Sequence, residues 1–70
     1  MNFTVGDVVQ LKSDGPKMTI QKIIGVNTSK KENFVYTHTG HAVDDLICQW
    51  FNGDKLETDI FKPQTLRKVE

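Results

Sequence analysis

Short runs of alternating apolar and polar residues dominate this 70-residue chain, and no long stretch follows the helical period of 3.6 residues. The runs are rich in Val, Ile, Phe, Tyr and Thr, and clusters of Gly, Pro, Asn and Asp separate them. The pattern predicts one all-β domain over residues 1–70, a small SH3-like five-stranded barrel whose closure would protect the sheet edges. The five strands are expected near residues 7–12, 17–24, 45–51, 55–61 and 66–69, with a 3₁₀ turn at residues 63–65 before the last.

The two hairpins fix the expected register. In the first hairpin, a loop at residues 13–16 sets Met18 opposite Leu11 and Ile20 opposite Val9. In the second, Asn52-Gly53 is a strong turn signal. A three-residue loop with Gly53 at positive φ sorts the side chains best. The loop is either residues 52–54, which places Trp50 opposite Leu56, or residues 51–53, which sorts the two faces in the same way. The inward set is then Leu46, Cys48, Trp50, Leu56 and Ile60, and the outward set includes Ile47, Gln49 and Phe51.

Residues 27–43 fit this outline least well. Seventeen residues without structure would be unusual in a domain of this size. The run "NFVYTH" has high β-propensity, and the polar run "SKKEN" precedes it. We predict an inserted hairpin arm at about residues 27–43.

Two motifs resemble the YodC-like family of small uncharacterised bacterial proteins. They are "VGDVVQLKSDGPKMTI" and "CQWFNG", and the resemblance covers residues 3–26 and 44–69. Asp14 replaces a glycine that is usual in the first motif, and the segment between the motifs is longer than in the family. The resemblance implies family membership and no activity.

Charge and cysteine usage narrow the class of protein. Nine Lys and Arg balance nine Asp and Glu, and the pI is about 6.7, whereas nucleic-acid binders usually have a basic face and a high pI. The single Cys48 has no disulfide partner within the chain, which suits a reducing compartment. With no apolar run long enough for a signal peptide or a membrane span, we expect a cytoplasmic protein without membrane contact.

The segment "HTGHAVDDLIC" holds several metal-ligand types. His38, His41 and Cys48 match the zinc preference for imidazole and thiolate, and Asp44 or Asp45 could orient a catalytic His. However, strand parity points Cys48 into the core, where a thiol behaves as a small apolar group. A small barrel also lacks a deep cleft. We therefore expect no metal, no cofactor and no enzymatic activity.

The expected function is that of a non-enzymatic interaction module that binds a protein partner or itself. The outward aromatic face would consist of Phe34, Tyr36, Ile47 and Phe51, and the arm could exchange between copies to form a homodimer. The open alternative to the dimer is a monomer whose own arm covers Phe51. The alternative function is RNA or DNA binding through a lysine patch formed by Lys12, Lys17 and Lys22.

Overall fold

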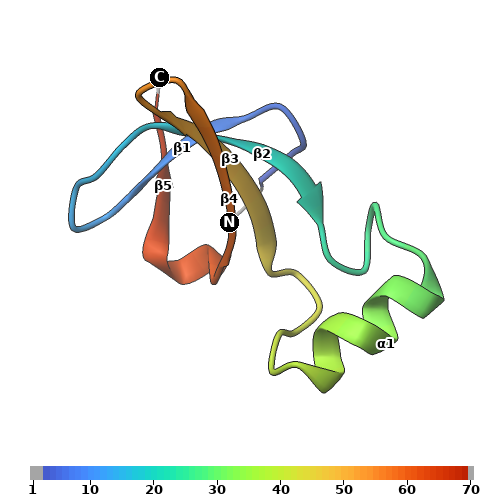
Figure 1. The fold of residues 1–70 in the computed structure, drawn as a ribbon. Coiled ribbons are helices and arrows are strands. Elements are labelled where there is room, and N and C mark those ends of the chain that lie inside the picture. Colours follow the sequence, from blue (N-terminus) through green and yellow to red (C-terminus); the bar gives the residue numbers. More distant parts are fainter. Residues whose placement is uncertain (1–2, 70) are drawn as a thin grey trace.

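The computed structural model describes residues 3–69 and consists of an antiparallel five-stranded sheet with one α-helix that stands apart from it (Figure 1). In chain order the elements are β1 (Val8–Leu11), β2 (Met18–Ile23), α1 (Lys30–His38), β3 (Leu46–Asn52), β4 (Lys55–Phe61), the 3₁₀ turn η1 (Pro63–Thr65) and β5 (Leu66–Lys68). The five predicted strands and the 3₁₀ turn are therefore confirmed.

The strand order across the sheet is β4-β3-β2-β1-β5, so β4 and β5 form the two edges. These edges are joined only by Lys62 and η1. A flat sheet would separate its two outer strands by about 19 Å, which is more than this short connection with a 3₁₀ turn spans. The sheet must curl, but β4 and β5 do not pair within residues 3–69. The predicted closed barrel is thus wrong, and the fold is a curled, open sheet.

The concave side of the curl holds the core. Its buried members come from all strands except β4: Val9, Met18, Ile20, Ile23, Leu46, Cys48 and Leu66. Phe3, Leu11, Trp50 and Phe61 pack around this cluster and are partly buried. In the first hairpin Met18 pairs with Val9 rather than with Leu11. This register differs from the predicted one by two residues, so the same side chains still face inward.

The β3–β4 hairpin has a different loop from the predicted one. Asn52 pairs with Lys55, which leaves a two-residue loop of Gly53 and Asp54. Gly53 has a φ of +64°, in keeping with the predicted positive φ and with the place that two-residue hairpins give to glycine. Phe51 therefore pairs with Leu56, and Trp50 pairs with Glu57.

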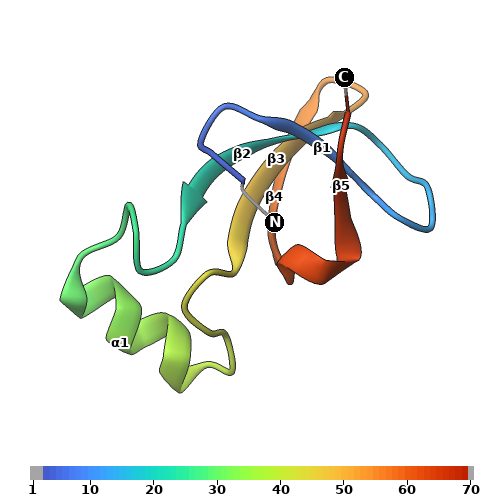
Figure 2. The same cartoon turned by 180° about the vertical axis from the view of Figure 1, so that it is seen from behind.

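The inserted segment forms helix α1 rather than a hairpin, as Figure 1 and the reverse view in Figure 2 both show. Ser29 is the N-cap: its side chain accepts a hydrogen bond from the backbone N–H of Glu32, and the Glu32 carboxylate accepts one from the N–H of Ser29. This capping box satisfies free N–H groups of the first turn. With this capping box, residues 33–38 form a helix although their β-propensity is high.

Candidate interaction surfaces

Helix α1 is held at its first turn by a few polar contacts. In addition to the capping box, Glu32 forms an ion pair with Lys22 of β2 at 3.6 Å. The Asn33 side-chain oxygen accepts a hydrogen bond from the backbone N–H of Gly25 at 3.2 Å. No residue of α1 is buried. Isolated helices shorter than about 12–15 residues are marginal in water, so this nine-residue helix receives little support from its own chain.

The arm, defined here as residues 25–44, exposes several apolar side chains. Phe34 is 70% exposed and Val35 is 56% exposed, on adjacent positions of α1. The ring of His38 stacks on Phe34 with centroids 5.9 Å apart, and Tyr36 makes an edge contact with His41 at 6.4 Å. Single exposed apolar residues are common on protein surfaces. A helix that exposes its apolar residues and buries none, however, gains little stability from packing within its own fold.

The two ends of the arm are joined by hydrogen bonds at its base, where the arm leaves the sheet. Ile24 and residues 44–45 exchange backbone hydrogen bonds of 2.9 and 3.0 Å. The Asp45 carboxylate is almost fully buried; it accepts hydrogen bonds from the N–H of Ala42 at 3.0 Å and from Nζ of Lys62 at 2.8 Å. A buried carboxylate requires such partners. Asp45 therefore joins the end of the arm to the segment just before η1.

Gly25 allows the close approach of the two sides of this base. Its φ is +89°, and an added Cβ would lie 2.6 Å from Cγ1 of Val43. Any other residue here would meet both a strained backbone and a steric clash. The point at which the arm departs is thus set by a glycine.

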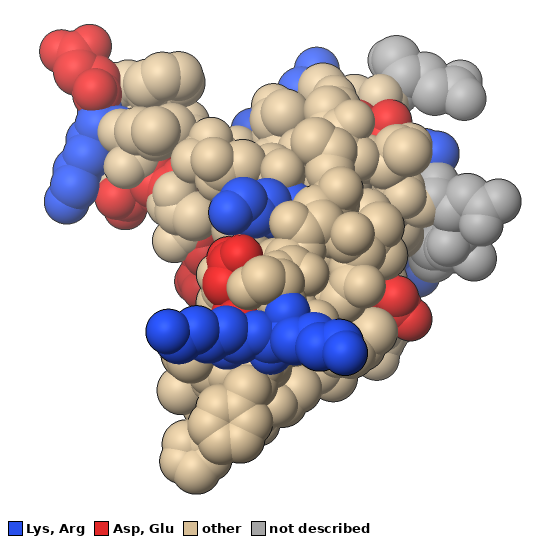
Figure 3. Space-filling view, turned by 90° about the vertical axis from the view of Figure 1, so that its right-hand side faces the viewer, with Lys and Arg blue, Asp and Glu red and all other residues tan. Residues whose placement is uncertain are grey.

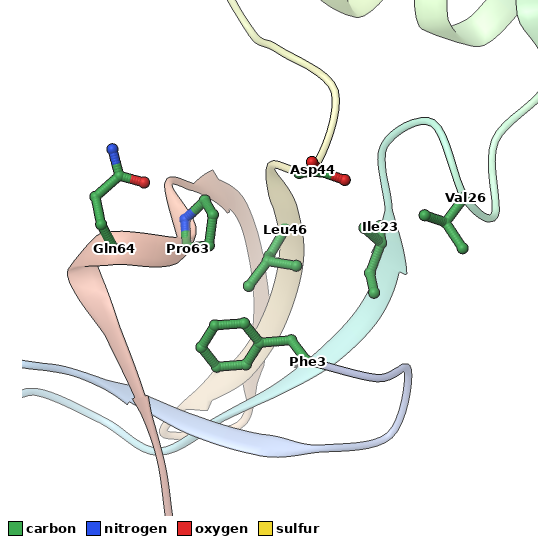
Figure 4. A pocket seen from close by; sticks show the side chains of 7 residues that line it. All are labelled: Phe3, Ile23, Val26, Asp44, Leu46, Pro63 and Gln64. Carbon is green, nitrogen blue, oxygen red and sulfur yellow. The ribbon is translucent and has the colours of Figure 1, made fainter. Parts of the chain in front are cut away.

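A groove of about 460 Å³ opens beside the base of the arm (Figure 4). Ile23 and Leu46 come from the sheet, and Phe3 lies across from them on the N-terminal segment. Its remaining lining residues are Val26 and Asp44 from the arm, and Pro63 and Gln64 from η1. The lining is mostly apolar, with one carboxylate and one amide at its rim. The size lies within the range of pockets that bind ligands in proteins.

The tip of the β3–β4 hairpin exposes a second apolar pair. Phe51 is 70% exposed, and its cross-strand partner Leu56 is also exposed. β3 runs from the base of the arm to this tip over seven residues, or about 20 Å. The arm and the hairpin tip therefore lie at opposite ends of the sheet.

The four residues predicted to form one aromatic face do not do so. Phe34 and Tyr36 lie on α1, and Phe51 lies at the distant hairpin tip. Ile47, which was expected to face outward into solvent, is only 6% exposed. It pairs with Ile60 and Lys22 on either side of β3. Both faces of the sheet are thus apolar near the base of the arm, which the simple alternation rule does not anticipate.

The three lysines of the predicted nucleic-acid patch are also separated. Lys12 and Lys17 flank the turn between β1 and β2, whereas Lys22 lies about 15 Å further along β2 and is paired with Glu32. Within residues 3–69, five of the nine basic side chains form ion pairs with N–O distances from 2.8 to 3.8 Å. On the face drawn in Figure 3, the basic and acidic side chains of residues 3–69 are interspersed with uncharged ones.

The candidate metal and catalytic residues lie in different parts of the molecule. Cys48 is fully buried in the core, and this burial raises the pKa of its thiol to about 11. His38 and His41 lie on the arm, against Phe34 and Tyr36. Among residues 3–69, no group of three or more His, Cys, Asp or Glu side chains could hold a metal ion. In the same range, no helix combines the length and hydrophobicity needed to cross a membrane.

The groove and the buried Asp45 are features that the sequence did not reveal. The groove residues come from four separate segments of the chain, so no local motif contains them. Asp45 had one weak signal, because it directly precedes the apolar run of β3 and adjoins a second aspartate. Which of the two is buried depends on Lys62, which lies 17 residues further on.

Comparison with known proteins gives one match. The family model of "Uncharacterized small protein (DUF2158)" matches residues 4–66, which include the whole arm. No curated protein and no solved structure matches the chain. The match spans both sequence motifs and the segment between them, and the chain belongs to the DUF2158 family of uncharacterised small proteins.

Proposed function

We propose that the chain is a non-enzymatic interaction module that binds a protein partner, or a second copy of itself, through the apolar side chains of its arm. The observation that carries the proposal is helix α1, which exposes Phe34 and Val35 and buries none of its residues. A helix this short gains most of its stability from packing an apolar face. A bound partner would supply that packing.

Three finer assignments accompany this proposal. The strand order and the 3₁₀ turn before β5 support an open sheet of SH3-like type. The motifs at residues 5–20 and 48–53 support the YodC-like, bacterial branch of small proteins. A single buried cysteine supports a cytoplasmic setting.

Two other functions have less support. A nucleophilic role for Cys48 requires a thiolate, and its raised pKa keeps the thiol protonated at neutral pH. Nucleic-acid binding requires neighbouring free cations, and Lys22 is engaged by Glu32 far from Lys12 and Lys17. Binding that falls steeply with salt and disappears after nuclease treatment would replace the proposal with the nucleic-acid function.

The experiment is an affinity capture with the full chain and two matched variants. Phe34→Asp removes the aromatic side chain of the arm, and Phe51→Asp makes the same change at a residue of equal exposure on the hairpin tip. We expect nuclease-treated extracts to yield a specific partner with the wild type and with Phe51→Asp, but not with Phe34→Asp. Equal capture by all three proteins would contradict a role for the arm.

A further inference from the structure

We propose that the arm of one copy docks into the groove beside the base of the arm in a second copy, so that two chains exchange arms around a two-fold axis. This inference rests on the proposed function and names the partner of the arm. It is carried by the position of α1 relative to the groove, by their charges, and by the apolar surfaces that both leave open.

The groove is not filled by helix α1 of its own chain, and only Val26 and Asp44 of the arm contribute to its lining. Ile23 lines the groove, and its neighbour Lys22 forms the ion pair with Glu32 of α1. Successive residues of a strand point to opposite faces of the sheet. The ion pair that holds the first turn of α1 therefore starts from the face opposite to the groove, and no residue of α1 lines the groove. Figure 4 shows the lining residues of the groove with helix α1 lying away from them.

The arm is available to a second molecule. In Figures 1 and 2, α1 projects beyond the end of the sheet and is joined to it by two connecting segments. The lowest part of the molecule in Figure 3, at the height of α1 in Figure 1, ends in uncharged surface. The exposed Phe34 and Val35 provide the large and small apolar side chains that a groove of about 460 Å³ can receive.

The charges of the two surfaces are complementary. Lys30 and Lys31 precede Phe34 on α1 and form no ion pair with another residue in the range 3–69. Asp44 at the rim of the groove is exposed and is likewise free of ion pairs within that range, whereas Asp45 is already matched by Lys62. Docking α1 into the groove would bring two free cations toward one free carboxylate. Such pairs orient a complex more than they strengthen it.

The geometry allows the assembly to close. Both the arm and the groove belong to every chain, and a two-fold axis makes two identical arm-to-groove contacts at once. The edge strand β4 is a less suitable interface. It alternates Lys55, Glu57 and Asp59 along one face, and charged side chains on an edge strand oppose pairing with another sheet. The exchange therefore uses the arm rather than extending the sheet.

The first test measures the mass of the full chain by sedimentation equilibrium. We expect a dimer of twice 8.0 kDa. Phe34→Asp should weaken dimerisation by at least about 30-fold, as expected for an aromatic anchor, and Phe51→Asp should leave it unchanged. Circular dichroism checks that the variants keep the sheet. A monomer at all soluble concentrations, or a dimer that Phe34→Asp leaves intact, overturns the exchange.

The second test locates the contact. In a mixture of isotope-labelled and unlabelled chains, filtered NMR should detect contacts between the Phe34 ring of one copy and the Ile23 and Val26 methyl groups of the other. Replacing Lys30 and Lys31 together by Glu should weaken the dimer about three- to tenfold. The same change at Lys12 and Lys17 is the matched control and should have no effect. Intermolecular contacts at Phe51 instead of Phe34 would overturn the proposal.

The outcomes separate this inference from the proposed function. A monomer that captures another protein through Phe34 retains the function of the arm and rejects the exchange. A monomer whose capture is insensitive to Phe34→Asp rejects both. A dimer with Phe34 in the groove supports both.

Discussion

Phe34 and Phe51 are exposed to the same extent, yet the elements that carry them are supported very differently. Phe51 lies on a strand that pairs along all seven residues with β4, and it faces Leu56 across the hairpin. Phe34 lies on a helix that contributes nothing to the core. Strand pairing therefore stabilises the element that carries Phe51, whereas no burial of side chains stabilises the helix that carries Phe34. This difference makes the arm the stronger candidate for a binding element.

The largest expected effect separates the core from the arm. Ile20→Ala should lower the free energy of unfolding by about 3 kcal/mol, because it leaves a cavity in the core. Phe34→Ala should change the stability of the monomer by less than about 0.5 kcal/mol, as is usual for an exposed side chain.

Labelling of Cys48 by a thiol reagent at neutral pH measures this difference. The thiol is fully buried and its pKa is about 11, so it reacts only when the core opens. Ile20→Ala should accelerate labelling about 100-fold when opening is a rapid equilibrium. Fast labelling of the wild-type protein, or an equal effect of Phe34→Ala, would contradict the conclusion that the sheet is stable and that its stability does not depend on the arm.

The next effect concerns the joint between the two regions. Asp45→Asn should lower the free energy of unfolding by about 1.5 kcal/mol, because the neutral amide loses the ion pair with Lys62. Asp44→Asn is the matched control: the residue is exposed, and asparagine tolerates its φ of +80°. Chemical denaturation of both variants measures the difference. Equal midpoints would show that the ion pair between Asp45 and Lys62 does not contribute to stability.

The same comparison explains which parts of the fold were predictable from the sequence. The strands and η1 follow from local alternation and from Pro63, and the structure confirms them. The inward positions of Leu46 and Cys48 were also correct, since they lie where β3 crosses the core. Leu56 and Ile60 were placed inward wrongly. The two-residue loop shifts the register by one, so these two residues pair with Phe51 and Ile47 instead of with the core residues of β3.

The arm was mispredicted because two local signals conflicted. The run at residues 33–38 favours a strand, whereas Ser29 and Glu32 have the spacing of a capping box. With no neighbouring strand for this segment to pair with, the capping box prevails. The groove could not be predicted from the sequence for another reason, because its residues come together only when the sheet curls.

The third prediction tests the capping box directly. Ser29→Ala should destabilise α1 by about 1 kcal/mol, since one N–H of the first turn loses its acceptor. The sheet should be unaffected, because α1 contributes no buried residue to it. Hydrogen exchange measured residue by residue should accelerate in α1 and stay constant in β3. Ser13→Ala, in the turn between β1 and β2, is the control and should alter neither element.

The smallest effect is a pH dependence confined to the arm. The Ser29 N–H and then the Lys22 ammonium lower the pKa of Glu32 below its usual value of 4.5. A carboxyl group with a lowered pKa in the folded state stabilises that state above its unfolded value, and this contribution disappears as pH falls through the folded value. The first turn of α1 should therefore loosen below pH 4.5, which the NMR signals of Ser29 and Glu32 can follow. Asp7 also has a lowered pKa, through the Thr4 N–H and then Lys68, but it reports on the sheet. Glu32→Gln cannot ionise, so its α1 signals should be insensitive to pH in this window, and an unchanged wild-type arm in acid would contradict the role of the Glu32 carboxylate.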